Sequence, residues 1–541
     1  MSVTFKKKLE FNFIRFLRFL RALFKQKKGI VGFTILIVFL ILALVPHWFT
    51  PYHPTKTEGL AGSMAAPSWI KYLPGVKGYC ENIYLTEDPG FSRISTLKEF
   101  DINATAFGRV YLGYSHTMGY PYAYGGGPGC IFINYVRTRA SPGNTSVFLT
   151  KKLAYPYDAS PERFSGDIAF FIEGSVKRIV NDRPILDVPV SITFFVINGE
   201  NKRFNLWRAS EQPIETPSVD WVSTRASKES VISVLDSRST YLKEVMYGYV
   251  LDNATGQLKP YWHFYSVTPE EDIFGNFPQN LTIGLEILFI DKGGEENAEV
   301  TLYLDGLQFR TLGKAWGLLG TDKLGRDLFT QLVYGVRVSL YVGVLASVLG
   351  VIIGLVVGLA AGYLGKVVDE VLMRFADMLL VIPGLPLLIV LVAVLGASLN
   401  NLIILLGFLG WMGFSRVVRS QVLSLRERPF VEAAKAAGGG SFYIMFRHIV
   451  PNVMALVYVT LATSVPGAVV AEASLSWLGF FDPNVMSWGR MLHDAQVELA
   501  AFDKWWWILP PGLCIAALAL SFILIGFSLD EVLNPRLRER K

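Results

Sequence analysis

The sequence predicts a polytopic α-helical membrane protein with a β-rich extracellular domain inserted between its first and second transmembrane helices. Hydrophobic residues make up 51% of the chain and charged residues only 18%, and the mean hydropathy of +0.37 is typical of membrane proteins. Apolar runs long enough to cross a bilayer, which takes about 20 residues, occur near the N-terminus and again in the C-terminal part. The long stretch between them has no such run, so we expect it to form a separate domain.

Six segments are expected to span the membrane. Residues 338–364 contain no charged side chain, and residues 505–529 form an equally clear span. A nearly uncharged stretch, 378–415, turns at 396–401 and therefore holds two spans. The expected transmembrane helices cover residues 29–49, 337–364, 373–397, 401–419, 452–475 and 505–529, and a loop at 420–450 separates the fourth helix from the fifth.

The positions of Lys and Arg predict how these helices are oriented, because basic residues concentrate on the cytoplasmic side. Residues 6–28 carry nine of them, and more lie in the loop 420–450 and at the C-terminal end. Both termini and this loop are therefore expected in the cytoplasm of a cell-membrane protein. Residues 1–28 are expected to form a basic amphipathic segment on the membrane surface, rather than a cleaved signal peptide or a nucleic-acid-binding arm.

Residues 50–315 are expected to form the extracellular domain, because about 250 residues can bury a substantial core. Short bursts rich in β-branched and aromatic residues alternate with turn signals, which is typical of strands. Examples lie at 167–173, 188–197, 281–290 and 299–305. A β-sandwich or jelly roll is the architecture that this pattern favours.

All four Asn-x-Ser/Thr tripeptides of the chain lie in this domain. They are Asn103, Asn144, Asn253 and Asn280. Their confinement to the external segment predicts N-glycosylation on the cell exterior. Cys80 and Cys130 lie in the same segment, and a disulfide between them is favoured over two free thiols.

No catalytic constellation stands out in the sequence. The six histidines are scattered without metal-ligand spacing. The glycine-rich run 124–130 lacks the Lys-Ser/Thr of a phosphate loop, and no Walker A pattern occurs in the chain. We therefore expect a non-catalytic protein that binds neither a metal nor a cofactor.

The most informative stretch is 432–452, where an Ala-rich helix stops at a glycine turn and a second short helix runs into Pro451. The small side chains after Glu432 would let the backbone approach a partner protein closely. Ser441 is expected to cap the second helix. An ordinary loop between two transmembrane helices is the alternative interpretation.

This stretch resembles the coupling loop of ABC-importer permeases, through Glu432, Ala433, Ala434 and Gly438, with Pro451 thirteen residues after that glycine. Outside the insertion, further motifs resemble the second, C-type membrane subunit of dipeptide/oligopeptide ABC permeases. They lie at 319–327, 334–339, 472–479, 487–492, 505–512 and 529–537. The resemblance is loose over the first 50 residues, close over 315–541 and absent from the insertion.

The resemblance implies a type I ABC-importer permease that forms half of a translocation pathway. Its partners would be a second homologous permease, two ATPase subunits that bind ATP and Mg, an extracellular solute-binding protein and the lipid bilayer. Peptides are the expected cargo and oligosaccharides the alternative; a membrane-anchored receptor or adhesin is the alternative of another class. The ATPase-coupling residues would be Glu432, Ala433, Ala434, Gly438, Gly439, His448 and Pro451.

Candidates for the pathway or its gates are Asp377, Pro383, Glu472, Trp477 and Trp488. The two carboxylates lie at span edges, where contact with lipid would be costly, so we expect them to face the bundle and to pair with Arg374 or solvent. For the insertion, docking of the solute-binding protein is favoured over a protective shield. A third possibility is solute binding by Trp207, Trp221 and Trp262, which could stack on sugars.

Overall fold

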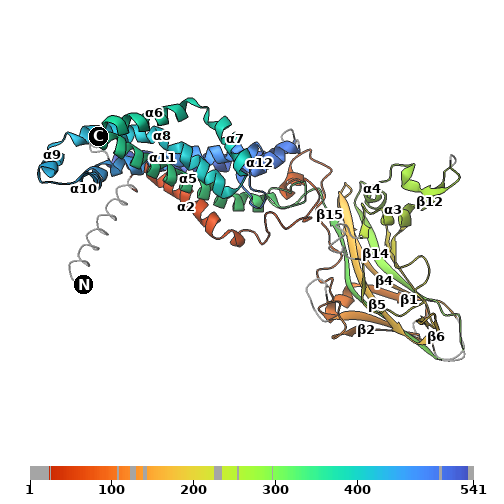
Figure 1. Ribbon diagram of the computed structural model, residues 1–541. Coiled ribbons are helices and arrows are strands. Elements are labelled where there is room, and N and C mark those ends of the chain that lie inside the picture. Colours follow the sequence, from red (N-terminus) through yellow and green to blue (C-terminus); the bar gives the residue numbers. More distant parts are fainter. Residues whose placement is uncertain are drawn as a thin grey trace. The chain divides into compact units, whose positions relative to one another are not determined.

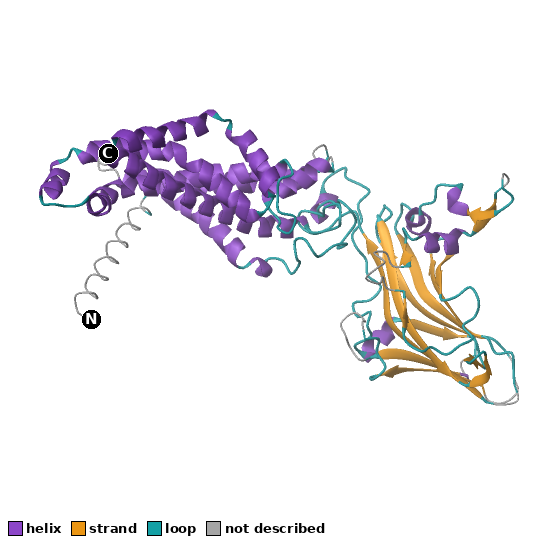
Figure 2. Cartoon of the chain, viewed as in Figure 1, coloured by secondary structure: helices purple, strands orange, loops and turns teal. Residues whose placement is uncertain are grey.

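The computed structural model describes residues 24, 26–106, 109–121, 129–137, 143–224, 234–252, 255–294, 297–498 and 503–533 (Figures 1 and 2). The chain forms two compact units. The helical unit joins Met1–Glu58 to Arg326–Lys541, and the β-unit comprises Gly59–Gly325. The β-unit extends past the expected end at residue 315, because the segment that follows bonds back to the start of the unit. The amide of Met64, for example, donates to the carbonyl of Asp322 at 2.8 Å.

Within the described residues of the helical unit, five helical stretches are long and apolar enough to cross a membrane. They contain α2 (Lys27–Leu44), α5 (Leu328–Leu364), α8 (Leu399–Arg426), α11 (Val450–Trp477) and α13 (Trp505–Leu533). The longest, α5, begins before the expected residue 337, because the Asp327 side chain accepts a hydrogen bond from the amide of Thr330 at 2.8 Å and caps its first turn. A short helix, α12 (Trp488–Val497), precedes α13.

The third expected span, 373–397, is a pair of helices rather than one. Helix α6 (Lys366–Val381) and helix α7 (Gly384–Leu395) meet at an angle of 90°. Proline explains the break: Pro383 has no amide proton, and Ile382 before it takes an extended ψ of 128°. Counted as one crossing, the bent pair brings the number of candidate spans to six.

Glycines at every fourth position of α5, from 350 to 362, let this helix lie close to α8. A Cβ on Gly354 would come within 2.9 Å of the carbonyl oxygen of Trp411, and a Cβ on Gly358 within 2.6 Å of that of Ser415. No larger residue fits at these distances. The helix pair is therefore held by backbone proximity of the kind that small residues allow between transmembrane helices.

The β-unit is a sandwich of two antiparallel sheets. The first sheet has the order β1 (Asp101–Ala104), β4 (Thr145–Tyr155), β14 (Gln279–Phe289), β8 (Val190–Ile197) and β9 (Arg203–Arg208). The second has the order β10 (Val222–Ser223), β5 (Arg163–Gly174), β15 (Ala298–Leu312), β3 (Cys130–Arg137) and β2 (Val110–Ser115), and β11 (Leu235–Asp236) pairs with β5. Two hairpins, β6 (Val176–Val180) with β7 (Arg183–Leu186) and β12 (Tyr249–Leu251) with β13 (Leu258–Pro260), stand apart from them.

Aromatic rings from the two sheets meet in the core of the sandwich. Tyr135 of β3 stacks on Phe289 of β14 with ring centroids 5.1 Å apart, and Phe194 of β8 stacks on Phe309 of β15 at 5.9 Å. The prediction of a β-rich insertion is confirmed. Of the tryptophans considered for sugar stacking, Trp207 is 5% exposed and belongs to this core.

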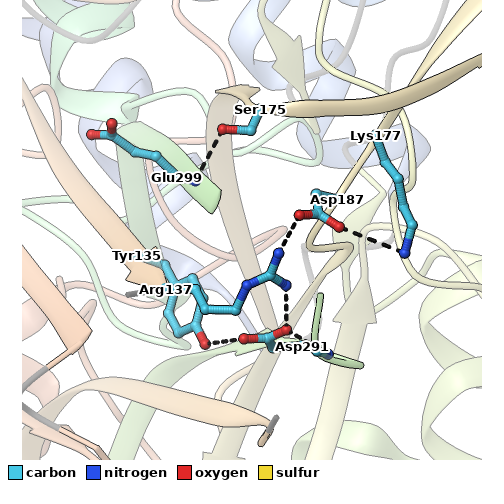
Figure 3. Close-up of polar contacts among 8 residues, drawn as sticks. Tyr135, Arg137, Ser175, Lys177, Asp187, Asp291 and Glu299 are labelled. Carbon is cyan, nitrogen blue, oxygen red and sulfur yellow. Dashed lines mark hydrogen bonds and ion pairs between the residues drawn. The ribbon is translucent and has the colours of Figure 1, made fainter. Parts of the chain in front are cut away.

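A buried cluster of ion pairs and hydrogen bonds links the two sheets at one end of the sandwich (Figure 3). The guanidinium of Arg137 donates to Asp291 at 2.7 Å and to Asp187 at 2.5 Å. The hydroxyl of Tyr135 donates to Asp291 at 2.8 Å. Arg137 is 2% exposed and Asp291 3%, so these charges depend on one another rather than on water.

The expected disulfide is not formed in this structure, where Cys80 and Cys130 carry free thiols. The two thiols have different surroundings: that of Cys80 donates to the carbonyl of Ser160 at 3.5 Å, whereas Cys130 begins β3 opposite Ser115 of β2. Burial raises the pKa of both thiols, that of Cys130 to about 12. Asn103, Asn144 and Asn280 are exposed, as glycan acceptors must be, and Asn253 lies outside the described residues.

Asp305 of β15 makes the stability of the β-unit depend on pH. Burial raises the pKa of this fully buried carboxyl to about 7, despite hydrogen bonds from the amides of Tyr120 and Gly306. The folded state therefore holds the proton more tightly than the unfolded state, so stability falls as the pH rises from about 4 to about 7.

Asp305→Asn is expected to remove this part of the pH dependence. At pH 8 the variant should melt at least about 5 °C above the parent, and the difference should vanish near pH 4. Calorimetry of the purified chain measures both temperatures, and Asp101→Asn, at an exposed position of β1, is the control. A difference that does not change with pH would contradict the assignment.

Candidate coupling site

The loop that the sequence singled out is a short helix, a glycine turn and a second short helix. Helix α9 (Pro429–Ala436) begins with a proline, which suits the first helical turn, and carries Glu432 in that turn, where the helix dipole favours a negative charge. The chain then reverses at Gly438, whose φ is +83°. The amide of Gly439 closes the turn by donating to the carbonyl of Ala434 at 3.0 Å.

The second half of the loop is α10 (Ser441–Ile444), followed by one wide π-helical turn (Met445–Ile449) that leads into α11. Ser441 was expected to cap α10, and this prediction is wrong. The N-cap position is occupied by Gly440, and no side chain bonds the free amides there.

Four apolar side chains fix the loop to the transmembrane bundle. Val431, Ile444, Met445 and Ile449 are buried in a cluster that also contains residues of α5, α8 and α11. Lys435 extends over the ring of Tyr363, at the end of α5, with its ammonium 5.7 Å from the ring centroid. The loop is therefore anchored to three helices, so a force on it would be transmitted to them.

Three aromatic side chains of the loop are exposed instead. Phe442 is 76% exposed, Phe446 62% and Tyr443 58%. Glu432, Ala433, Ala436 and Ala437 are exposed beside them. These aromatic residues were not among the predicted coupling residues, although the spacing of Phe442 and Phe446 by one helical turn, just after the glycines, was a signal in the sequence.

The other predicted coupling residues lie at the base of this face. The ring of His448 meets the ring of Tyr443 edge-on at 5.5 Å, and its carbonyl accepts a hydrogen bond from the Asn452 side chain at 2.7 Å. Pro451 is exposed in the first turn of α11. The structure thus brings the whole predicted coupling set into one anchored, protruding element.

Asp377 pairs with Arg416 of α8, not with Arg374 as expected. About two helical turns earlier on α6, Asp369 accepts two hydrogen bonds from Arg419 at 2.5 and 2.6 Å. Arg374 lies between these ion pairs and helps to line a polar hollow of about 320 Å³. Both aspartates of α6 are therefore paired with arginines of α8.

Glu472 lies on α11 and Trp488 on α12, two helices that pack against each other. Glu472 is 1% exposed and accepts a hydrogen bond from the Ser476 hydroxyl at 2.7 Å. The indole of Trp488 donates to the carbonyl of Leu332 at 2.9 Å and packs on Phe39 of α2 with ring centroids 5.6 Å apart. Trp477 is 46% exposed at the end of α11, and Pro383 lies at the α6–α7 bend. The five gate candidates therefore do not form one site.

Comparison with known proteins agrees with this arrangement. Residues 350–539 match the family described as binding-protein-dependent transport system inner membrane component. Residues 15–67 match the N-terminal transmembrane domain of oligopeptide transport permease C. The coupling loop lies inside the first match, and most of the β-unit lies outside both.

Several relatives are curated bacterial permeases. The dipeptide transport system permease protein DppC of Bacillus subtilis is 37% identical over 220 residues, which cover 40% of this chain and 68% of the relative. The oligopeptide transport system permease proteins OppC of Bacillus subtilis and Haemophilus influenzae are 39% and 36% identical, each over 41% of this chain and over 72% and 71% of the relative. Among solved structures, an inward-facing MetNI methionine ABC transporter is similar at 18% identity over 35% of this chain and 96% of that chain, with a TM-score of 0.26, too low to say anything of the fold.

A bundle of apolar helices with an anchored helix–turn–helix loop defines a multi-pass membrane permease. The chain belongs to the family of binding-protein-dependent transport system inner membrane components, and it is a permease subunit of an ABC importer. The resemblance to the C-type subunit is confirmed by the match of residues 15–67 and by the similarity to DppC and OppC.

Proposed function

We propose that this chain forms half of the pathway of an ATP-driven importer of dipeptides or oligopeptides. The observation that carries the proposal is the loop 432–451, which presents three exposed aromatic rings on a base anchored in three helices. An ATPase subunit would bind this face, and a second homologous permease would supply the other half of the pathway. The peptide cargo is supported by the names of the similar permeases.

In this proposal the chain crosses the membrane six times, with the bent α6–α7 pair as one crossing and both termini in the cytoplasm. The distribution of Lys and Arg supports this orientation. The β-unit then lies outside the cell, where its three exposed sequons are open to glycosylation. There it would meet the solute-binding protein that delivers the cargo.

Reconstitution of the chain with its partner permease, ATPase subunits and solute-binding protein in liposomes tests the proposed function. ATP-dependent accumulation of labelled peptides is expected, with oligosaccharides of similar size as the comparison. Accumulation of oligosaccharides but not peptides would exclude the proposed cargo while leaving the coupling mechanism intact. Purification of the chain without any ATPase subunit would favour a receptor instead.

Gly438→Ala is expected to lower peptide uptake roughly 5- to 30-fold, because an alanine held at φ +83° costs about 1–2 kcal/mol. Nothing lies within 4 Å of the added methyl group, so the effect would come from the backbone alone. Gly440→Ala is the matched control: its methyl group also has open space, but its φ is −69°. Equal uptake by the two variants would mean that the shape of the turn does not matter for coupling.

A further inference from the structure

The chain enters and leaves the β-unit at one end of the sandwich. The amide of Gly59 donates to the carbonyl of Leu324 at 2.9 Å, and Ala66 bridges Ala315. Strand β15 ends there at Leu312, which is paired with Arg163 at the start of β5. We call this the tethered end.

A small cap of helices and one hairpin lies at the same end. It comprises α3 (Thr240–Tyr247), the β12–β13 hairpin, a 3₁₀ turn (Tyr261–His263) and α4 (Pro269–Phe274). The amide of Ser237, just before α3, donates to the carbonyl of Phe164 at the start of β5, and Gln279 after α4 pairs with Tyr155 at the end of β4. The β6–β7 hairpin instead follows the far end of β5, and Figure 1 shows it at the opposite end of the β-unit from α3 and α4.

The cap exposes a group of apolar and aromatic side chains. On one face of the hairpin, Leu251 pairs directly with Leu258, and Tyr249 lies two residues away on the same side. These residues are 56%, 69% and 53% exposed. The loops that follow the 3₁₀ turn and α4 expose three further rings. We call the full set the cap patch: Tyr249, Leu251, Leu258, Phe264, Tyr265 and Phe277, each at least 45% exposed.

The covalent connection keeps the tethered end near the membrane. Gly325 is three residues from Leu328 at the start of α5, a reach of at most about 11 Å. The 37 residues of α5 form a helix about 55 Å long, against about 40–45 Å for a bilayer with its headgroups. The tethered end therefore cannot move far from the outer bilayer surface.

The composition of the patch suits a lipid surface. Tyrosine rings with polar tips and Phe or Leu side chains prefer the boundary between hydrocarbon and headgroups. Lys259, whose ammonium is 2.6 Å from Asp252, lies on the other face of the same hairpin and would stay in water. Because the tether keeps the bilayer permanently close, even a weak affinity of the patch for lipid would suffice.

We propose that the cap patch binds the outer leaflet of the bilayer and serves as a second membrane contact for the chain. The proposal rests on the external position of the β-unit, but not on the nature of the cargo. This lipid contact would limit the movement of the β-unit on the two segments that join it to α2 and α5. The surface that would face a solute-binding protein is thereby limited to the rest of the β-unit.

A fluorescent label at residue 258 of the full chain in nanodiscs tests the proposal. Leu258→Cys is labelled in a Cys514→Ala background, because Cys80 and Cys130 are buried. Ile179→Cys in the β6–β7 hairpin is the matched control, since Ile179 is 70% exposed and Leu258 69%. With nitroxide-labelled lipid headgroups, the label at 258 should lose most of its emission and the label at 179 should keep it.

Equal emission from the two labels would overturn the proposal. So would a label at 258 that responds to the solute-binding protein but not to the nitroxide lipid, because the patch would then be a protein-docking surface. Loss of quenching with intact peptide uptake would refute only the lipid contact, whereas quenching without peptide uptake would refute only the cargo.

The sequon at Asn253 offers an independent measurement. It lies between Leu251 and Leu258 in the sequence, and a bulky polar glycan there would keep the hairpin out of the headgroup region. The proposal therefore expects mass spectrometry of the native protein to find Asn253 unmodified. A glycan on Asn253 would contradict it.

Discussion

Replacing Phe442 and Phe446 by alanine is expected to release the ATPase subunit and abolish uptake. Both rings are exposed on the coupling loop, at 76% and 62%, whereas the anchors Val431, Ile444, Met445 and Ile449 are buried. Exposed aromatic residues at the centre of an interface each contribute about 2 kcal/mol or more, which is roughly 30-fold in affinity. Losing both would weaken binding by more than roughly 30-fold and by up to roughly a thousandfold, because the effects of neighbouring residues do not simply add.

The measurement is co-purification of the ATPase with the tagged permease, followed by ATP-dependent uptake in liposomes. Tyr111→Ala in β2 removes an aromatic ring of similar exposure, 60%, from the other unit, and should leave both readouts unchanged. The anchors remain in place in the double variant, so the permease itself should fold as the parent does. Normal ATPase binding by the double variant would mean that the partner does not use this face of the loop.

Arg137→Ala is expected to destabilise the β-unit by about 3–5 kcal/mol, because it leaves buried carboxylates without their partner. Among the residues that the structure describes, Asp291 would keep the Tyr135 hydroxyl and the amide of Gly293 as donors. Within the described part of the chain, the ion-pair partner left to Asp187 is the exposed Lys177, whose ammonium is 3.7 Å away. For a unit of this size the melting temperature should fall by about 10 °C.

Calorimetry or limited proteolysis of the detergent-solubilised chain would measure this loss. Arg238→Ala is the control, since Arg238 is 53% exposed and its partner Asp236 also contacts Arg163. That change should cost less than about 1 kcal/mol. If Arg137→Ala were no more harmful than Arg238→Ala, water must reach the cluster and satisfy the two aspartates.

The transmembrane helices could be found from the sequence because lipid requires long apolar runs, and α5 and α13 have no rival interpretation. The bend at Pro383 was harder to predict, since a proline in an apolar run can either kink a helix or end it. The helix–turn–helix at 429–444 was predicted from its alanines and glycines and is present in the structure, while its coupling role stays a prediction. The sequence did not show which side chains of the loop are exposed. That is decided by the anchors, which are buried against α5, α8 and α11.

In the β-unit the sequence indicated strands but not their partners. The Arg137 cluster joins residues about 50 and 150 positions apart, and local patterns carry no information about such pairings. Local patterns could not show whether the two cysteines pair either. Their expected location outside the cell favoured a disulfide. The fold places their thiols among different strands.

Local patterns in the sequence by themselves determined which segments are helix, strand or coupling turn, because hydropathy, glycine and proline act over a few neighbouring residues. The tertiary structure decided which charges are paired, which thiols stay apart and which aromatic rings remain exposed on the coupling loop and the cap. These outcomes depend on which distant segments exclude water from one another, and that is a property of the folded chain as a whole.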